Sequence, residues 1–232
     1  MSGTLFGVGT GPGDPELMTL KADRLIRNAT VVAYPAPDSG QSFARSIAAD
    51  VIDPGAREIP IVIPMRSERF PAQDIYDQAA AEIASELEAG QDVVVLCEGD
   101  PFFYGSFMYL FARLAGRFPT EIVPGVSSLS AVTAAARSPL CARSEVLTVL
   151  PATLPTDSLE ERLAGGGATA IMKLGKNFNK VRQVLDRMNL TENSIFVRHA
   201  SLKQELVCPL VEAPETAPYF SMIVIPGADA HV

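Results

Sequence analysis

Short apolar runs alternate with segments of helical period along most of the chain. Each run is bounded by glycine, proline or a charged or polar residue, a pattern that predicts buried strands. The predicted strands are residues 4–8, 30–34, 92–97, 121–123, 146–150, 169–174, 194–197 and 222–225. Strands that alternate with helices in this way predict an α/β fold.

Apolar residues between these runs recur every three or four positions, as they do on one face of a helix. Ile75 starts a series spaced by four that ends at Leu87, and Phe178 starts a second series that ends at Met188. A third helix, made of very small residues, is predicted over 127–136. The periodic signal then lapses around 137–144 before strands resume.

This lapse predicts a division into two α/β domains. We place the N-terminal domain at 1–138, a linker at 139–145 and the C-terminal domain at 146–232, with an uncertainty of about ±4 residues at the boundary. The glycine-rich loops are concentrated in the first domain, whereas the second carries a cluster of basic residues.

Composition narrows the classes of function. With 232 residues, of which 47% are hydrophobic, the chain can bury a substantial core. No run approaches the ~20 apolar residues of a membrane span and no secretion signal is recognisable at the start, so we expect a cytoplasmic protein. A net charge of −8 without a Lys/Arg-rich run disfavours nucleic acid as a partner. The three cysteines lie far apart, without histidines at metal-ligand spacing, and predict neither disulfides nor a metal site.

The first candidate site is the loop GVGTGPGD at 7–14, which follows a predicted strand. Its glycines allow backbone to approach a ligand closely. A dinucleotide fingerprint fails here, because Pro12 or Asp14 stands in the third glycine position, and a phosphate loop fails for lack of Gly-Lys-Ser/Thr. Asp14, followed by Pro15, also predicts a helix start. The alternative is that the loop is only a tight connection.

Two further loops follow predicted strands. EGDPFFYGS at 98–106 offers Asp100 for ribose hydroxyls or an amino group, and its aromatic residues can cover a flat ring; the alternative is a helix start at Asp-Pro. VPGVSSLSA at 123–131 turns into the small-residue helix, where a ligand or neighbouring backbone can come close. Its alternative is a helix that simply packs tightly against its neighbours.

Taken in order, GVGTGPGDPELMTLKA, EGDPFFYGS and EIVPGVSSLSA resemble the tetrapyrrole methylase family, the class III S-adenosylmethionine-dependent methyltransferases, over essentially the whole chain. Within the family, LCEGDPFFYGSFMYLFARL at 96–114 is similar to members that methylate C-20 of precorrin-2 to give precorrin-3A in cobalamin biosynthesis. Glu98 stands where other members usually have glycine, which favours this group.

The resemblance implies a homodimer of two-domain α/β subunits, with S-adenosylmethionine in the cleft between domains and the macrocycle in an adjoining trough. It assigns the first glycine loop, Gly9, Gly11 and Gly13, to the substrate side. Family members often have methionine where Leu174 stands. The implied donor contacts are Pro12, Glu98, Gly99, Asp100, Phe103, Ser127, Ser128, Leu174, Ala200, Ser221 and Met222.

Methyl transfer from a sulfonium needs no protein nucleophile or metal, only positioning, exclusion of water and a modest base. The candidate bases are Glu98, Asp14, Tyr104 and His199. Instead of acting as a base, Asp14 could cap a helix. His199 could likewise be a strand-end residue that only hydrogen-bonds to the backbone.

The resemblance also implies a substrate with eight carboxylates, which calls for cations. The candidate cations are Arg66, Arg69, Lys173, Lys176, Lys180, Arg198 and Lys203. The alternative for those on the helix, Lys176, Lys180 and Arg182, is a solvated face.

Other functions stay open at this point. The substrate of such an enzyme could be precorrin-2 or its cobalt complex, and another family member, such as an enzyme for a different ring position or a diphthine synthase, is a further alternative. From a different class, a non-catalytic nucleotide-binding module would also use glycine loops, although the failed dinucleotide fingerprint argues against it.

Overall fold

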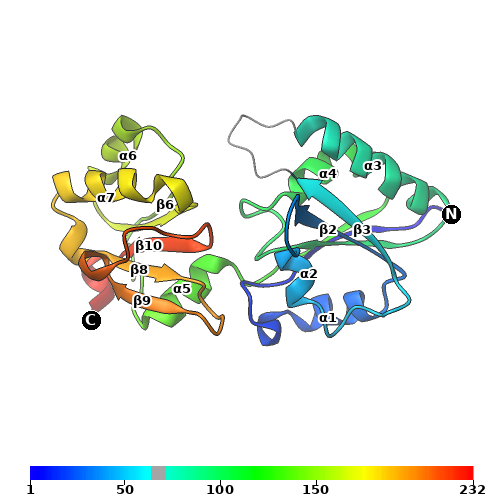
Figure 1. The fold of residues 1–232 in the computed structure, drawn as a ribbon, viewed down its shortest axis with the longest axis horizontal. Helices are drawn as coiled ribbons and strands as arrows, with labels where there is room; N and C mark the ends of the chain where they lie inside the picture. Colours follow the sequence, from blue (N-terminus) through cyan, green and yellow to red (C-terminus); the bar gives the residue numbers. More distant parts are fainter. Residues whose placement is uncertain (64–71, 232) are drawn as a thin grey trace. The chain divides into compact units, whose positions relative to one another are not determined.

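The computed structural model describes residues 1–63 and 72–231. The chain divides into two compact units, Met1–Ser127 and Ser128–Val232, and each is built on one five-stranded sheet (Figure 1). The α/β fold predicted from the sequence is confirmed. Within the described ranges, no helix has both the length and the apolar character needed to cross a bilayer.

The first unit contains a fully parallel sheet in the order β3-β2-β4-β1-β5. Its strands are β1 (Leu5–Gly9), β2 (Val31–Pro37), β3 (Arg57–Ile63), β4 (Val93–Cys97) and β5 (Thr120–Val123). Every residue of β4 is buried, as expected for a central parallel strand covered on both faces. Leu5 of β1 pairs with Val93 on one side and Thr120 on the other.

Helices cover both faces of this sheet (Figure 1). They are α1 (Leu20–Arg27), α2 (Phe43–Ile47), α3 (Ala72–Glu88) and α4 (Phe107–Leu114), preceded by the 3-10 helix η1 (Pro15–Leu17). Val93 and Val95 of β4 pack with α3 and α4, whereas Val94 and Leu96 pack with α1 and α2. Successive side chains of the strand point to opposite faces of the sheet and therefore contribute to two separate cores.

The second unit contains a mixed sheet in the order β6-β7-β10-β8-β9. Its strands are β6 (Leu147–Pro151), β7 (Ala168–Met172), β8 (Ile195–Arg198), β9 (Leu206–Pro209) and β10 (Ser221–Ile225). Only the β6/β7 pair is parallel; the other three pairs in this sheet are antiparallel.

Three α-helices pack on this second sheet (Figure 1). They are α5 (Ser128–Ala136), α6 (Thr156–Leu163) and α7 (Phe178–Arg187). Leu159 of α6 and Phe178 of α7 pack with Phe196 on one face, and Val132 of α5 packs with Val197 on the other. The unit also contains the 3-10 helices η2 (Gly175–Asn177), η3 (Thr191–Asn193), η4 (Leu210–Glu212) and η5 (Ala228–His231).

Each predicted strand is present, but β3 and β9 were not predicted. Along β3 exposed and buried positions alternate and Pro60 interrupts the run, so no continuous apolar segment marks the strand. Strand β9 lies at the sheet edge and its four residues are only partly buried or exposed. Edge strands carry a weaker hydrophobic signal because one side of the strand has no partner.

The helix start predicted at Asp14 is confirmed, but the helix that begins there is the 3-10 helix η1 and not an α-helix. Asp14 Oδ1 accepts a hydrogen bond from the Glu16 amide at 2.9 Å, but it opens only the three-residue η1. The α-helix starts at Leu20 instead, capped by Thr19, whose Oγ1 accepts from the Ala22 amide at 3.1 Å.

The division between the units also differs from the predicted boundary after residue 138. Helix α5 belongs with the second unit because Val132, with Leu129 and Ala135, packs on the second sheet. The segment that was predicted to be a linker is also held there, since the Gly227 amide donates to the Leu140 carbonyl at 2.9 Å. A helix of small residues gives no sequence sign of which sheet it covers.

Candidate functional site

Three loops leave three neighbouring parallel strands at the same edge of the first sheet. Loop 1 (10–14) follows β1, loop 2 (98–106) follows β4 and loop 3 (124–127) follows β5. The strand order β4-β1-β5 puts β1 in the middle, so the loops start side by side. The carboxyl edge of a parallel sheet is where α/β proteins place ligands.

Backbone hydrogen bonds join loop 1 to loop 2. The Gly99 amide donates to the Gly11 carbonyl at 2.8 Å, and the Gly11 amide donates to the Gly99 carbonyl at 3.3 Å. The Thr10 amide and Oγ1 both donate to the Cys97 carbonyl, at 2.8 and 3.0 Å. The two loops therefore continue the pairing of the strands beyond the sheet.

The end of β1 and loops 2 and 3 also pack with almost no space between their backbones. A Cβ atom on Gly9 would lie 2.5 Å from the Gly99 carbonyl oxygen and 2.6 Å from the Gly125 nitrogen. A Cβ atom on Gly125 would lie 1.9 Å from the same oxygen. Gly11 and Gly13 adopt positive φ angles of 83° and 154°, which favour glycine. Packing and turn geometry thus account for these glycines; their predicted contact with substrate stays a prediction.

Asp100 ties loop 2 to loop 3. Its Oδ1 accepts from the amides of Phe102 and Phe103 at 2.9 and 3.0 Å, and its Oδ2 accepts from the Gly125 amide at 3.1 Å. Helix α4 begins only at Phe107, so Asp100 is not the cap of that helix. The carboxylate fixes the loop geometry, and Oδ2, which accepts only one of these bonds, retains a lone pair for a ligand hydroxyl.

Glu98 lies at the end of β4, close to the first turn of α2. Its side chain is partly buried, and burial raises the pKa of its carboxyl, while the amides of Glu98 and Ala44 act in the opposite direction. Helix α2 is fixed at this end by Ser42, whose Oγ accepts from the Arg45 amide at 3.2 Å and donates to the Pro35 carbonyl at 2.5 Å.

A charged pair anchors α2 to the sheet. Arg45 Nε and Nη2 donate to the two carboxylate oxygens of Glu58 on β3, at 2.7 and 2.8 Å. Hydrogen bonding to Arg45 lowers the pKa of Glu58, and burial followed by the proximity of Glu58 raises the pKa of Tyr34 on β2. The pair therefore holds the turn that faces Glu98.

Loop 2 and α4 present an exposed aromatic surface, formed by Phe102, Phe103, Tyr104, Met108 and Phe111. Phe102 and Phe111 contact edge to face with centroids 5.1 Å apart, and Phe103 and Tyr104 do so at 5.3 Å. Tyr104 has a positive φ of 59°, a strained conformation for a bulky residue. These rings are suited to cover a flat conjugated molecule.

In the second unit, several predicted residues gather at one end of the sheet. Arg198 at the end of β8 pairs with Ser221 at the start of β10, and Met222 pairs with Met172 at the end of β7. Lys173 follows Met172 directly and thus lies at the same end, with a φ of 60°. His199 and Ala200 follow β8.

Other predicted contacts of this unit are occupied by its own packing. Leu174 is fully buried and Met222 is 3% exposed, each within an apolar core. Ser221 Oγ donates to the Pro218 carbonyl at 2.5 Å, and Lys180 Nζ donates to the Leu154 carbonyl at 2.6 Å. Their roles toward a ligand remain predictions.

The remaining candidates are scattered. The His199 amide donates to the Phe220 carbonyl at 2.9 Å, and burial together with Arg198 lowers the pKa of its imidazole. Burial likewise lowers the pKa of Lys173. Pro12 in loop 1 and Ser127 and Ser128 around the start of α5 are partly buried, whereas Lys176 and Lys203 are exposed. Arg66 and Arg69 lie outside the described residues.

Residues 4–213 match the family model of the Tetrapyrrole (Corrin/Porphyrin) Methylases. The chain belongs to this family.

Two curated proteins are similar in sequence to this tetrapyrrole methylase. It is 45% identical over 234 residues to the cobalamin biosynthesis protein CobIJ of Mycobacterium tuberculosis (strain ATCC 25618 / H37Rv), covering 97% of this chain and 46% of that protein. The chain thus spans about half the length of that relative. It is 39% identical to the precorrin-2 C(20)-methyltransferase of Sinorhizobium sp, covering 97% of this chain and 96% of that protein.

Solved structures share the fold of the methylase. The cobalt precorrin-4 methyltransferase CbiF superposes with a TM-score of 0.77 at 24% identity, over 96% of this chain and 94% of that one. The uroporphyrin-III C-methyl transferase of Thermus thermophilus, complexed with S-adenyl homocysteine, gives a TM-score of 0.68 at 24% identity, over 96% and 97%.

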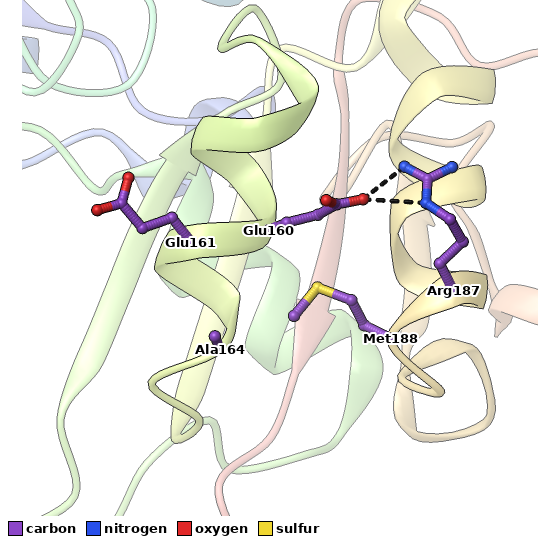
Figure 2. Close-up of a pocket in the computed structure, with 5 residues that line it drawn as sticks. All are labelled: Glu160, Glu161, Ala164, Arg187 and Met188. Carbon is purple, nitrogen blue, oxygen red and sulfur yellow. Dashed lines mark hydrogen bonds and ion pairs between the residues drawn. The ribbon is translucent and has the colours of Figure 1, made fainter.

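Figure 2 shows a surface hollow of the methylase that lies between α6 and α7 and is lined by Glu160, Glu161, Ala164, Arg187 and Met188. Arg187 Nε and Nη2 donate to Glu160 Oε1 at 3.0 and 2.6 Å. Arg187 and Met188 stand at the end of α7 that leads toward β8, opposite to the strand ends that carry Lys173 and Arg198. Arg187 is paired with Glu160, which leaves the charge of Glu161, and no candidate residue lies in this hollow.

Sequence reasoning on the methylase missed Arg45, Glu58 and Ala44. Glu58 lies in β3, which was not predicted, and Ala44 and Arg45 lie in the five-residue α2. The bidentate Arg45–Glu58 pair depends on β2 and β3 being neighbours, and no local pattern indicates this. Among the residues that the structure describes, no three His, Cys, Asp or Glu side chains gather as metal ligands.

Proposed function

We propose that the protein transfers a methyl group from S-adenosylmethionine to C-20 of precorrin-2, giving precorrin-3A, in cobalamin biosynthesis. The observation that carries the proposal is the 39% identity to the Sinorhizobium precorrin-2 C(20)-methyltransferase, which extends over nearly the full length of both chains. The mycobacterial CobIJ relationship supports the same pathway.

The geometry of the first unit is compatible with a bound donor. Glycine backbone at the end of β1 and in loops 2 and 3 comes together so closely that Cβ atoms added to Gly9 or Gly125 would collide, and Asp100 holds loops 2 and 3 through three amides. Such fixed backbone can bind a small polar molecule without reorganising. When bound, S-adenosylmethionine supplies an electrophilic methyl group, and we assign Pro12, Glu98, Gly99, Asp100, Phe103 and Ser127 to its contacts in this unit.

Among the candidate bases, Glu98 fits proton transfer best. Burial raises the pKa of its carboxyl, which brings the group closer to the pH at which it can both accept and release a proton. The Asp14 carboxylate is engaged with the Glu16 amide. His199, whose pKa is lowered by burial and by Arg198, is the second candidate, and Tyr104 is the third.

The other assignments follow from the family resemblance and complete the proposal. Leu174, Ala200, Ser221, Met222 and Ser128 are assigned to the donor, and the candidate cations to the carboxylates of the macrocycle. We further propose that the protein acts in the cytoplasm as a homodimer.

The test is anaerobic incubation of the protein with S-adenosylmethionine and freshly generated precorrin-2, with a parallel reaction on the cobalt complex. We expect one added methyl group by mass and its assignment to C-20 by NMR of the labelled carbon. Binding of S-adenosylhomocysteine without transfer would leave the family and change the substrate. Failure to bind S-adenosylhomocysteine at all would reject the methyl transfer itself.

A further inference from the structure

Arg198 carries a guanidinium whose Nε is left without a hydrogen-bond partner in the described part of the chain. This Nε is buried, and the guanidinium takes part in no ion pair with a described residue. Other arginines of the protein do have carboxylate partners: Arg45 pairs with Glu58 and Arg187 with Glu160. Enclosing part of a charged donor without a partner is costly, and a ligand that offers acceptor oxygens would offset this cost.

The position of Arg198 suits a ligand better than a structural bond. It is the last residue of β8, opposite Ser221 and Leu206 on the flanking strands. Lys173 follows β7 at the same end and adds positive charge, while burial lowers its pKa. Burial, and after it the charge of Arg198, lowers the pKa of His199. Glu212 acts on neighbouring Cys208 but makes no ion pair with Arg198.

We infer that Arg198 is the central residue of a carboxylate-binding subsite at the end of β8, with Lys173 adding positive charge. The planar fork of arginine matches the two oxygens of a carboxylate. The source of that carboxylate rests on the proposed function, which supplies two: the amino-acid end of the methyl donor and the acid side chains of the tetrapyrrole.

Arg198→Met tests the subsite, since methionine keeps an apolar stem without the guanidinium. Arg187→Met is the matched control, because it removes an arginine of the same unit that already has a partner. Loss of a hydrogen bond to a charged group corresponds to roughly 10- to 100-fold in affinity. Arg198→Lys keeps the charge without the fork, and we expect an intermediate loss.

Two arms distinguish the sources. If the donor supplies the carboxylate, Arg198→Met weakens binding of S-adenosylhomocysteine about 10- to 100-fold and leaves methylthioadenosine, which lacks the amino-acid end, unchanged. If the tetrapyrrole supplies it, S-adenosylhomocysteine binds normally and KM for precorrin-2 rises by a similar factor at unchanged kcat. Either result supports the subsite; affinities and KM within about twofold of the wild type in both arms would overturn it.

Two further measurements are independent of the proposed function. Should the wild type bind neither compound, titration with succinate followed by the NMR signal of His199 still decides: saturable shifts in the wild type that vanish in Arg198→Met support the subsite. Because Arg198 makes no ion pair with a described residue and its Nε has no hydrogen-bond partner there, Arg198→Met should unfold at a urea concentration equal to or above that of the wild type. A variant that unfolds much earlier or fails to fold would identify Arg198 as structural and sink the inference.

Discussion

The candidate site of the first unit consists mainly of backbone groups, whereas that of the second unit consists of side chains. In the first unit, the site is backbone: glycine amides and carbonyls of loops 1 and 2 bond to each other, and the Asp100 carboxylate joins loop 3 to them. In the second unit, the candidates are side chains: Lys180 on α7 is bonded to a carbonyl, and Arg198 Nε at the end of β8 has no hydrogen-bond partner among the described residues.

This difference explains why one region is easier to read from a sequence than the other. Backbone that must pack closely or turn sharply requires particular residues. A short stretch rich in Gly, Pro and Asp therefore indicates such a loop without information from the rest of the chain. A lysine or arginine is compatible with a solvated face, an internal bond or a ligand. The role of such a residue is decided by distant neighbours, and each prediction below tests one side of this contrast.

The largest effect is expected for Gly125→Ala. The added Cβ would lie 1.9 Å from the Gly99 carbonyl oxygen. That oxygen belongs to the backbone and the Cβ is bonded directly to Cα, so neither atom can move aside cheaply. We expect a loss of about 3 kcal/mol in the free energy of unfolding, measured by urea denaturation. Gly116→Ala is the control, since no atom lies within 4 Å of its Cβ position. Equal stability of the two variants would contradict close packing of the loops.

Asp100→Asn should have the next largest effect. Asparagine can still accept from the Phe102 and Phe103 amides through its oxygen, but its NH2 group would then face the Gly125 amide, donor against donor. A buried amide without an acceptor costs about 1–3 kcal/mol. Urea denaturation would give the loss, and calorimetry with S-adenosylhomocysteine would report whether loop 3 still supports binding. Unchanged stability would mean that Asp100 does not join the loops.

Much of the fold and part of the site could be predicted from the sequence. Buried strands such as β4 are continuous apolar runs, and loops 1, 2 and 3 are marked in the sequence by their Gly, Pro and Asp residues. Strand β3 could not be found because its exposed and buried positions alternate around Pro60. The Arg45–Glu58 pair depends on strand neighbours, and the burial of Leu174 and Met222 depends on helices packed against them.

Glu58→Gln asks whether a side-chain pair supports the backbone site of the first unit. Arg45 lowers the pKa of Glu58 below its ordinary value of 4.5. A lowered carboxyl pKa stabilises the fold fully above 4.5, and this contribution is lost as the pH falls through the lowered value. Both side chains are partly solvent-exposed, so we expect a loss of about 0.5–1 kcal/mol at pH 7.

The measurement for Glu58→Gln is urea unfolding of the wild type and the variant between pH 3 and pH 7. The difference should shrink toward zero at the acidic end. A difference that is independent of pH would show that packing, not charge, connects α2 to β3.

The smallest change in stability is expected for Glu98→Gln, and with the opposite sign. Burial raises the pKa of Glu98 above its ordinary value of 4.5, so the protonated form stabilises the fold below 4.5 and this benefit is lost as the pH rises through the raised value. Glutamine stays neutral, and the variant should therefore be slightly more stable than the wild type at pH 7 and equal to it at pH 4. Glu192→Gln, at an exposed position on η3, should show neither effect. If Glu98 is also the base of the proposed reaction, the same variant loses kcat while gaining stability, a combination that a purely structural carboxylate would not produce.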